Sequence, residues 1–406
     1  MNQSNNLIPL SLYIHIPWCV KKCPYCDFNS HALNENSLPE ETYIDALEQD
    51  LITDIAEFGT QHREIQSIFI GGGTPSLFSP TSIEKLLAMV FNHCICAPQM
   101  EITLEANPGT VDQKAFSGFR RAGINRLSMG IQSFQDQQLK NLGRIHNGHE
   151  AILAVEKAHH AGFDNMNLDI MHGLPNQTTA DALLDLETAL SLKPTHLSWY
   201  QLTLEPNTVF YQRPPVLPID DQLLDIQKAG ESYLASQGFR PYEISAYTDT
   251  ARHQKIASPT KNQILKGERY TDDRCKHNLN YWMFGDYLAI GAGAHGKITN
   301  LNTHQISRYW KMRHPKDYLA IEKPFLAGKK ILSSAELPFE FMMNALRLYQ
   351  EIPIALFETR THLKLQQMMP QLHEAQNQGL LIFNEKMVKT TELGKRFLND
   401  LLQIFL

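Results

Sequence analysis

Between residues 10 and 206 the chain repeats one unit, which consists of a short apolar run, a turn and a longer amphipathic stretch. The apolar runs are rich in β-branched or aromatic residues and are closed by turn-forming residues, which is typical of buried strands. They cover residues 10–17, 67–73, 101–108, 126–133, 165–175 and 196–206. Apolar positions at three- and four-residue spacing predict helices between these runs, over 83–94, 111–123, 151–162 and 181–192.

Regular alternation of buried strands and helices predicts a parallel sheet, because a parallel connection has to cross back over the sheet. Six such units are fewer than the eight of a closed βα barrel. We therefore expect an α/β fold built on an open, partial (β/α)6 barrel. Sheets of this kind place their active sites where the carboxyl ends of the strands converge.

The pattern divides the chain into three predicted parts: a barrel over 1–248, a connecting region over 249–330 and a C-terminal module over 331–406. The barrel part also contains a predicted helix at 220–238 and a predicted strand at 242–248. Residues 249–280 are polar with weak periodicity, which predicts a long irregular segment. Segments of that length in a compact domain are usually functional or mobile.

The C-terminal module has a different pattern. Helical stretches at 337–350 and 361–378 precede two short runs around Asn384 and a closing helix, which favours a winged-helix-like domain. From Glu336 onward, seven Lys or Arg stand against eight Asp or Glu, so no basic face for reading DNA is evident. We expect a lid or a docking module, and no nucleic acid as partner.

Composition narrows the class further. The 406 residues carry a formal net charge of −6 with 43% hydrophobic residues, which is ordinary for a globular protein. No apolar stretch reaches the roughly 18 residues that a membrane-spanning helix needs. The first residues lack a basic stretch before their apolar run, and three of six cysteines crowd into one loop. We expect a cytoplasmic protein, or one peripheral to the inner membrane.

The three crowded cysteines are Cys19, Cys23 and Cys26, in the run HIPWCVKKCPYCDF. Their C-x3-C-x2-C spacing lets one loop deliver three thiolates to three irons of a [4Fe-4S] cubane, which leaves the fourth iron free to chelate a small molecule. A disulfide framework is typical of small secreted chains, and this chain is large. A zinc site needs a fourth ligand at regular spacing, and none follows Cys26.

With this loop after the first strand of a partial βα barrel, the chain resembles the radical S-adenosylmethionine (SAM) superfamily. Within it, the chain resembles the family of oxygen-independent coproporphyrinogen III oxidases, through the motifs FIGGGTPS, LEANPG, GIQSF, LGRIH and LDIMHGLP. It is most similar to a heme-chaperone branch of that family. Phe28 stands where the oxidases carry a further cysteine, the first cluster cysteine is already residue 19, and residues 277–282 read HNLNYW.

The resemblance implies a set of SAM-binding residues near the cluster, each at or after a predicted strand end. Glycines allow the backbone to approach a ligand closely, an arginine fork suits the SAM carboxylate, and acidic or amide groups suit its amine and ribose hydroxyls. These residues are Tyr13, Tyr25, Gly72, Gly73, Thr74, Glu105, Gln132, Arg144 and Asp169. Taken one at a time, they could equally be turn residues, rim charges, a helix cap or core packing.

His277 is the implied heme ligand, since a neutral imidazole binds iron and the adjacent Tyr281 and Trp282 could stack on a flat macrocycle. By itself the run favours a buried structural histidine beside aromatic core. The resemblance implies three cofactors: the [4Fe-4S] cluster, SAM and heme. It also implies an electron donor such as a flavodoxin or ferredoxin, respiratory proteins that accept the heme, and by analogy a cluster-dependent homodimer.

Three functions stay open at this point. The first is a heme chaperone that transfers heme to respiratory proteins. The second is an oxygen-independent coproporphyrinogen III oxidase, a radical SAM decarboxylase that forms protoporphyrinogen IX. The third is a radical SAM enzyme acting on another substrate, with HNLNYW as structural core.

Overall fold

A computed structural model describes residues 8–33, 38–250, 273–320 and 322–406. Its centre is one twelve-stranded sheet in the order β14-β13-β12-β11-β1-β4-β5-β6-β7-β8-β10-β9. All six predicted barrel strands are present and pair in parallel in sequence order. They are β1 (Leu10–Ile16), β4 (Glu64–Gly72), β5 (Ile95–Ala106), β6 (Arg126–Gln132), β7 (Met166–His172) and β8 (His196–Gln201). The predicted α/β class with a partial barrel is confirmed.

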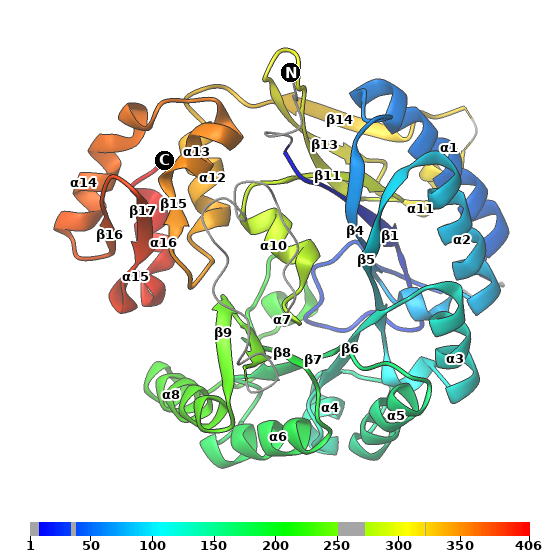
Figure 1. The fold of residues 1–406 in the computed structure, drawn as a ribbon. Helices are drawn as coiled ribbons and strands as arrows, with labels where there is room; N and C mark the ends of the chain where they lie inside the picture. The colour runs from blue at the N-terminus through cyan, green and yellow to red at the C-terminus, as the bar shows by residue number, and fades with distance from the viewer. Residues whose placement is uncertain (1–7, 34–37, 251–272, 321) are drawn as a thin grey trace.

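Helices cover the outer face of the curved sheet, and its inner face surrounds the space near α10 (Lys276–Trp282) (Figure 1). The repeats supply α1 (Glu40–Phe58), α2 (Pro80–His93), α3 (Gln113–Ala122), α4 (Asp136–Asn141), α5 (Gly148–His160) and α6 (Thr179–Ser191). After them come α7 (Val209–Gln212) and α8 (Asp220–Ser236). Several begin at side-chain caps; Asn147, for example, forms a capping box with Glu150 at the start of α5.

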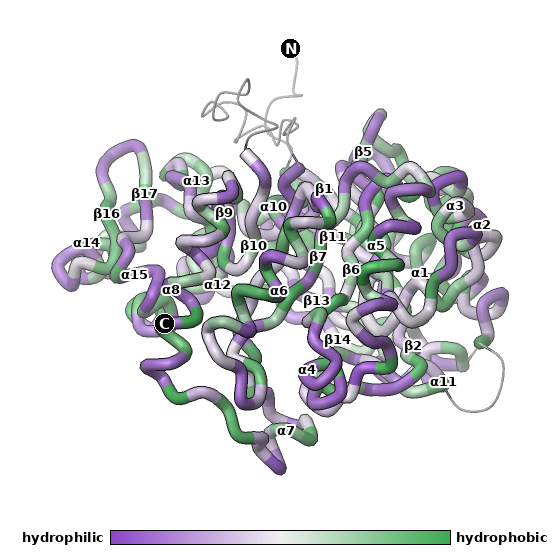
Figure 2. Tube along the Cα trace, turned by 90° about the horizontal axis from the view of Figure 1, so that it is seen from below, coloured by the Kyte–Doolittle hydropathy of each residue, from purple (hydrophilic) through white to green (hydrophobic). Residues whose placement is uncertain are grey.

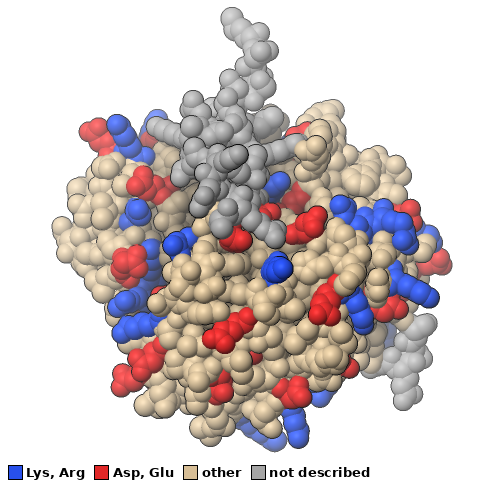
Figure 3. Space-filling model, turned by 60° about the horizontal axis from the view of Figure 1, so that its bottom comes forward, with Lys and Arg blue, Asp and Glu red and all other residues tan. Residues whose placement is uncertain are grey.

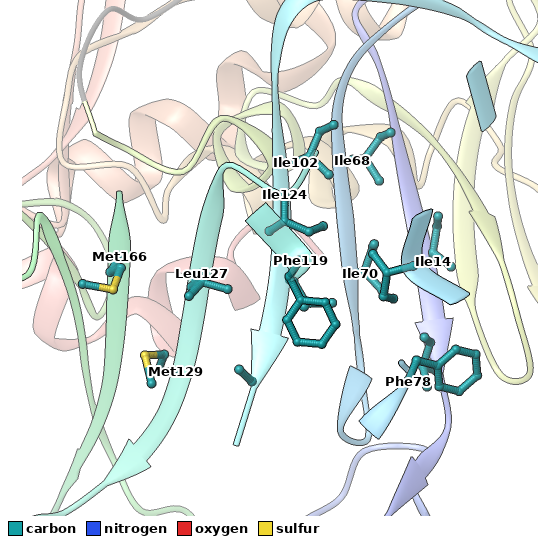
Figure 4. Packing of buried hydrophobic residues seen from close by; sticks show 14 of the residues in the cluster. Ile14, Ile68, Ile70, Phe78, Ile102, Phe119, Ile124, Leu127, Met129 and Met166 are labelled. Atoms are coloured by element: carbon teal, nitrogen blue, oxygen red, sulfur yellow. The ribbon is translucent and has the colours of Figure 1, made fainter. Parts of the chain in front are cut away.

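The hydrophobic core lies between the strands and this outer layer of helices. Ile70 on β4, Leu127 on β6 and Phe119 on α3 are fully enclosed there (Figure 4). Strands buried on both faces carry continuous apolar runs, as parallel sheets require. In the hydropathy view, hydrophobic and hydrophilic segments alternate along the chain, and the turn between β16 (Leu381–Phe383) and β17 (Met387–Thr390) is hydrophilic (Figure 2).

Both sides of the sheet are extended by strands that the repeat pattern did not include. On one side, β11 (Asp286–Ile290) pairs in parallel with β1, and β12 (His295–Thr299), β13 (Ile306–Lys311) and β14 (Leu326–Ile331) follow antiparallel, with α11 (Pro315–Tyr318) between the last two. On the other side, the single strand predicted over 242–248 is in fact two strands. The chain turns at Ser245, which has a positive φ of 68°, so β9 (Phe239–Glu243) and β10 (Ala246–Asp249) form a hairpin.

The segment predicted to be irregular over 249–280 lies largely outside the described residues. Its end is helical, because α10 takes up HNLNYW with Cys275 as the residue before the helix. Tyr242 accepts a hydrogen bond from the Cys275 backbone N–H at 3.1 Å, which holds the start of this short helix.

The C-terminal module is mostly helical, as predicted, with a small sheet β15-β17-β16. The prediction missed α13, because its eight residues are too few to establish a clear period. The elements are α12 (Leu337–Ala345), β15 (Ile352–Pro353), α13 (Ile354–Thr361), α14 (Met369–Asn377), β16 (Leu381–Phe383), β17 (Met387–Thr390), α15 (Glu392–Arg396) and α16 (Leu398–Gln403). Its hydrophobic core also takes in Leu279 and Phe284 from around α10.

Charged side chains of both signs are interspersed over the face drawn in Figure 3. Within the residues that the structure describes, no helix is long and apolar enough to cross a membrane.

Candidate functional site

A cavity of about 600 Å³ opens at the carboxyl ends of the parallel strands. It is lined by eleven of the thirteen residues that the sequence and the resemblance singled out. These are Cys19, Tyr25, Cys23, Cys26, Gly72, Gly73, Thr74, Glu105, Gln132, Arg144 and Asp169. Since they come from different strands and loops, the fold itself brings them together.

The cysteine loop is fixed at both ends. Cys19 lies in β2 (Trp18–Cys19), which pairs with β3 (His31–Ala32) and so closes the loop. All three cysteines are free thiols, and all three line the cavity. Burial raises the pKa of the Cys19 thiol, and a hydrogen bond from the Thr74 hydroxyl to its sulfur, at 3.5 Å, opposes that shift. Three soft donors on one cavity wall fit three corners of an iron–sulfur cubane.

The glycine-rich turn after β4 lies directly against this loop. Gly73 donates its N–H to the Ile16 carbonyl at 2.8 Å, and Thr74 donates to the Trp18 carbonyl at 2.7 Å. A Cβ on Gly73 would lie 2.5 Å from the Trp18 oxygen, which is too close for any side chain. Glycine is therefore required here for contact with the cysteine loop, in addition to any contact with a ligand.

Glu105 at the end of β5 lies beside this turn. Its carboxylate accepts the Gly72 N–H at 2.9 Å. Burial raises the pKa of Glu105 to about 8; the Gly72 hydrogen bond opposes the shift, and nearby Asp169 adds to it. No cation forms an ion pair with Glu105 among the described residues, so this carboxyl can accept or donate a hydrogen bond to a cavity ligand.

Arg144 lies on the same wall as the cysteines. It donates to the Gly130 carbonyl at 2.6 Å, and its other terminal nitrogen is 3.7 Å from the Cys23 sulfur. Its Nε is buried and has no hydrogen-bond partner within residues 8–33, 38–250, 273–320 and 322–406. Gln132, at a positive φ of 71°, accepts the Tyr200 hydroxyl at 2.7 Å. A guanidinium with spare donors beside a thiol suits a carboxylate bound next to a cluster.

Asp169 ends a buried chain of hydrogen bonds that begins at α10. The Tyr242 hydroxyl accepts the Cys275 N–H and lies 2.7 Å from His196 Nε2. On the other side of the imidazole ring, His196 Nδ1 lies 2.6 Å from Asn167 Oδ1. The Asn167 amide in turn donates to Asp169 at 2.8 Å. Because Asn167 Oδ1 can only accept, His196 carries its proton on Nδ1 and Tyr242 donates to Nε2. The chain links α10 to the cavity wall.

Two predicted residues do not line the cavity. Tyr13 is hydrogen-bonded to His15 Nδ1 at 2.9 Å, and His15 Nε2 is 2.9 Å from the Asn29 carbonyl of the cysteine loop. Tyr13 therefore contacts the loop through His15. His277 is 1% exposed, with Nδ1 3.1 Å from the Ser67 hydroxyl and Nε2 3.3 Å from the Tyr281 hydroxyl.

Burial lowers the pKa of His277 to about 3, with a further contribution from Arg126, so its imidazole is neutral near pH 7. Its enclosure matches the structural-core alternative that the sequence left open. The residues of α10 that reach the cavity are Asn278 and Trp282, one and five positions further along the chain.

Sequence reasoning missed several cavity residues. Tyr200 follows the strand-end rule that located the others and could have been found from it. Glu243 lies at the end of β9, and Arg347 comes from the segment after α12, more than a hundred residues further on. No local pattern marks Arg347, because only tertiary packing brings it to this cavity.

Comparison with known proteins agrees with this geometry. The model of the radical SAM superfamily matches residues 13–189, and that of the HemN C-terminal domain matches residues 332–397. A protein named heme chaperone HemW from Haemophilus influenzae is 50% identical to this chain, over 98% of this chain and 98% of that protein. A protein of the same name from Escherichia coli is 48% identical, over 98% of this chain and 99% of that protein. The solved coproporphyrinogen III oxidase HemN of Escherichia coli superposes with a TM-score of 0.79 at 21% identity, over 99% of this chain and 91% of that one.

The structural match at 21% identity establishes the fold, and full-length identity of about half establishes the family. The cysteine loop, the strand-end cavity and the HemN-type C-terminal module all agree with both. This chain belongs to the radical SAM superfamily and, within it, to the HemW family.

Proposed function

We propose that this protein is a heme chaperone that binds heme and a SAM-liganded [4Fe-4S] cluster and transfers the heme to respiratory proteins. The observation that carries this proposal is a single cavity. It joins the three cysteines of the loop to Asn278 and Trp282 of the HNLNYW run. The names of the curated relatives, heme chaperone, support the same assignment.

In this proposal Cys19, Cys23 and Cys26 hold three irons, and SAM binds the fourth. Arg144 would receive the SAM carboxylate, since it lies next to Cys23 and has an unpaired donor. Gly72, Gly73 and Thr74 would lie along the methionine portion, with Glu105 as acceptor for its amine. Gln132 and Asp169 would bind ribose hydroxyls, and Tyr25 would pack against the bound cofactor. The bound pair supplies either radical chemistry or a redox-dependent gate.

Heme would lie against the cavity side of α10. Trp282 offers an aromatic surface and Asn278 a side-chain amide there. His277, the proposed axial ligand, has the neutral imidazole that iron requires. Because its ring is enclosed between Ser67 and Tyr281, ligation of heme iron requires α10 to turn or shift.

The cellular setting belongs to the proposal as well. The protein would act in the cytoplasm or at the periphery of the inner membrane, where the respiratory acceptors receive heme. A flavodoxin or ferredoxin would reduce the cluster. A cluster-dependent homodimer is part of the family analogy, and size measurement before and after reconstitution tests it.

The test is anaerobic reconstitution with iron and sulfide, followed by heme titration with and without SAM. We expect a cluster spectrum that responds to SAM, and heme uptake with a histidine-ligated Soret band. His277→Ala should shift that band, whereas His149→Ala, an exposed residue on α5, should leave it unchanged. A reconstituted protein that takes up no heme would overturn the proposal. An unchanged band in His277→Ala would remove His277 as ligand.

The second candidate is an oxygen-independent coproporphyrinogen III oxidase, favoured by the fold match to HemN. Phe28, 65% exposed and lining the cavity, occupies the position of the oxidase's additional cysteine and speaks against it. An anaerobic assay with reduced cluster, SAM and coproporphyrinogen III separates the two. Vinyl-bearing product formed with turnover would replace the chaperone assignment.

A further inference from the structure

The cavity contains an arginine that has no ion-pair partner among the residues that the structure describes. Arg347 lines this cavity, and its guanidinium carbon lies 4.7 Å from the ring centre of Trp282. Within the described part of the chain it forms no salt bridge, and its Nε is buried with no hydrogen-bond partner. Burial lowers the pKa of Arg347, which means that its charge is incompletely compensated.

The position of Arg347 is nevertheless well fixed. Its carbonyl accepts the Ile244 N–H at 2.9 Å, and two residues later Tyr349 donates to the Tyr242 carbonyl at 3.0 Å. The side chain therefore extends from a backbone that hydrogen bonds hold in place, and its guanidinium stacks on one face of the Trp282 indole. Stacking leaves the in-plane N–H groups of a guanidinium free to donate.

Further unused hydrogen-bonding capacity surrounds it. The Trp282 indole N–H is also buried and has no partner in the described ranges of the chain. Glu243, 2% exposed, accepts the Asn278 amide at 3.0 Å, so this carboxyl already has a neutral donor. Burial raises the pKa of Glu243 to about 7, with Asn278 and Arg347 among the groups that oppose the shift. The donors open to a cavity ligand are the terminal nitrogens of Arg347, which form no hydrogen bond within the described residues, so an acceptor on a ligand would complete them.

We propose that Arg347 and Trp282 form a binding site for one carboxylate of a flat aromatic ligand. This deepens the proposed function and rests on it: the ligand is heme, and the group bound is one of its propionates. A guanidinium fork matches the two oxygens of a carboxylate. A phosphate dianion fits less well, because a second negative charge would meet Glu243 at close range. This anchor would hold one edge of the macrocycle beside Trp282 of α10.

The test compares heme with heme dimethyl ester, in which both propionates are capped, on the reconstituted full chain. We expect wild type to bind heme about tenfold more tightly than the ester, the ratio typical of one charge-assisted hydrogen-bonded contact. Arg347→Met should bind both ligands alike, and Arg347→Lys should keep part of the preference because it keeps charge without the fork. Arg396→Met, at an exposed arginine ending α15, should behave as wild type.

The other possible results each decide either the carboxylate site or the chaperone proposal. Equal binding of heme and ester by wild type overturns the carboxylate site while leaving the chaperone proposal intact. Binding of neither ligand removes the chaperone proposal itself. If Arg347→Met weakens both ligands equally, then the arginine acts only by packing on Trp282, and the inference is wrong. Should Arg347→Met fail to fold by circular dichroism, the ligand pair on wild type and Arg347→Lys still decides.

Discussion

Buried charged side chains occur in two regions of this protein, and the two regions differ in whether these charges form ion pairs. The first region, here called the seam, lies between α1 and strands β11–β13 and contains two groups of buried ion pairs. In one group, Asp286 accepts from Arg63 and Lys297, each at 2.8 Å. In the other, Lys311 pairs with Asp50 and Asp54. At the cavity, as far as the described residues go, Arg347 forms no ion pair and Glu105 accepts only from a backbone N–H. Burying a charge is costly in both regions.

The difference separates structural from functional charge. At the seam, each of these charges has an ion-pair partner within the chain, and these partners oppose the effect of burial, which still raises the pKa of Asp50 and Asp54 and lowers that of Lys297. At the cavity the compensation is missing, and a ligand is the natural source of it. Charge burial alone is therefore a poor marker of a site, whereas a charge that forms no ion pair and also lines a cavity is a better one.

The largest expected effect is at the seam. Asp286→Ala leaves Arg63 and Lys297 as uncompensated buried cations and removes the acceptor for the Thr299 N–H and hydroxyl. We expect the free energy of unfolding to fall by about 3–5 kcal/mol, measured by urea denaturation. Asp317→Ala, in an exposed pair with Lys323, is the matched control and should leave stability unchanged. Equal stability of both variants would contradict the structural role of the seam.

The second effect is a pH dependence at the cavity. Glu105 has a folded pKa of about 8, above its ordinary value of 4.5, so the folded state holds a proton that the unfolded state releases. Its contribution to stability is present below pH 4.5 and is lost as pH rises through 8. The unfolding free energy of Glu105→Gln should therefore rise by about 2 kcal/mol relative to that of wild type between pH 4.5 and pH 8.5. This figure is smaller than the full pKa shift would give, because solvent in the cavity screens the carboxylate.

Denaturation of both proteins at the two pH values measures this gain. Titrating groups distant from Glu105 cancel in the difference, because they are common to both proteins; Asp169, which interacts with Glu105, contributes to the measured change. A difference that does not change with pH would show that the Glu105 carboxyl titrates normally, and the cavity would then be less desolvated than its geometry implies.

A smaller effect is expected in the chain that links α10 to Asp169. Tyr242→Phe removes one hydroxyl and leaves the Cys275 N–H and His196 Nε2 without partners. Two buried groups without partners should cost about 1–2 kcal/mol in unfolding free energy. Tyr211→Phe, at a tyrosine that is 55% exposed, provides the control. If the two variants match, the chain contributes nothing measurable.

The smallest expected effect sharpens the comparison most directly. Lys297→Met should destabilise the protein strongly, because it strips a partner from Asp286, whereas Arg347→Met should change the unfolding free energy by less than about 1 kcal/mol. Methionine keeps much of the packing on Trp282, and no ion pair is lost. Thermal and urea denaturation of both variants check this. A large loss in Arg347→Met would place Arg347 with the structural charges.

Much of the site was predictable because strand ends are predictable. Glu105 and Gln132 lie at the ends of β5 and β6, and Asp169 lies within β7. Parallel strands bring their carboxyl ends to one edge, and eleven of the thirteen predicted residues line one cavity there. Tyr13 and His277 do not, because the direction of a side chain depends on what packs beside it. Tyr13 contacts His15, and His277 points to Ser67 on β4.

The amino-acid order by itself determined the cysteine loop, the parallel strand repeat and the strand-end residues, since these follow from short spacings and from local periodicity. Tertiary structure alone decided the addition of β11 to the sheet, the closed charge pairs at the seam and the arrival of Arg347 beside Trp282. Each of these joins segments far apart in the chain. Contacts between such distant segments produce no periodic pattern in the sequence, because they depend on the packing of the whole fold.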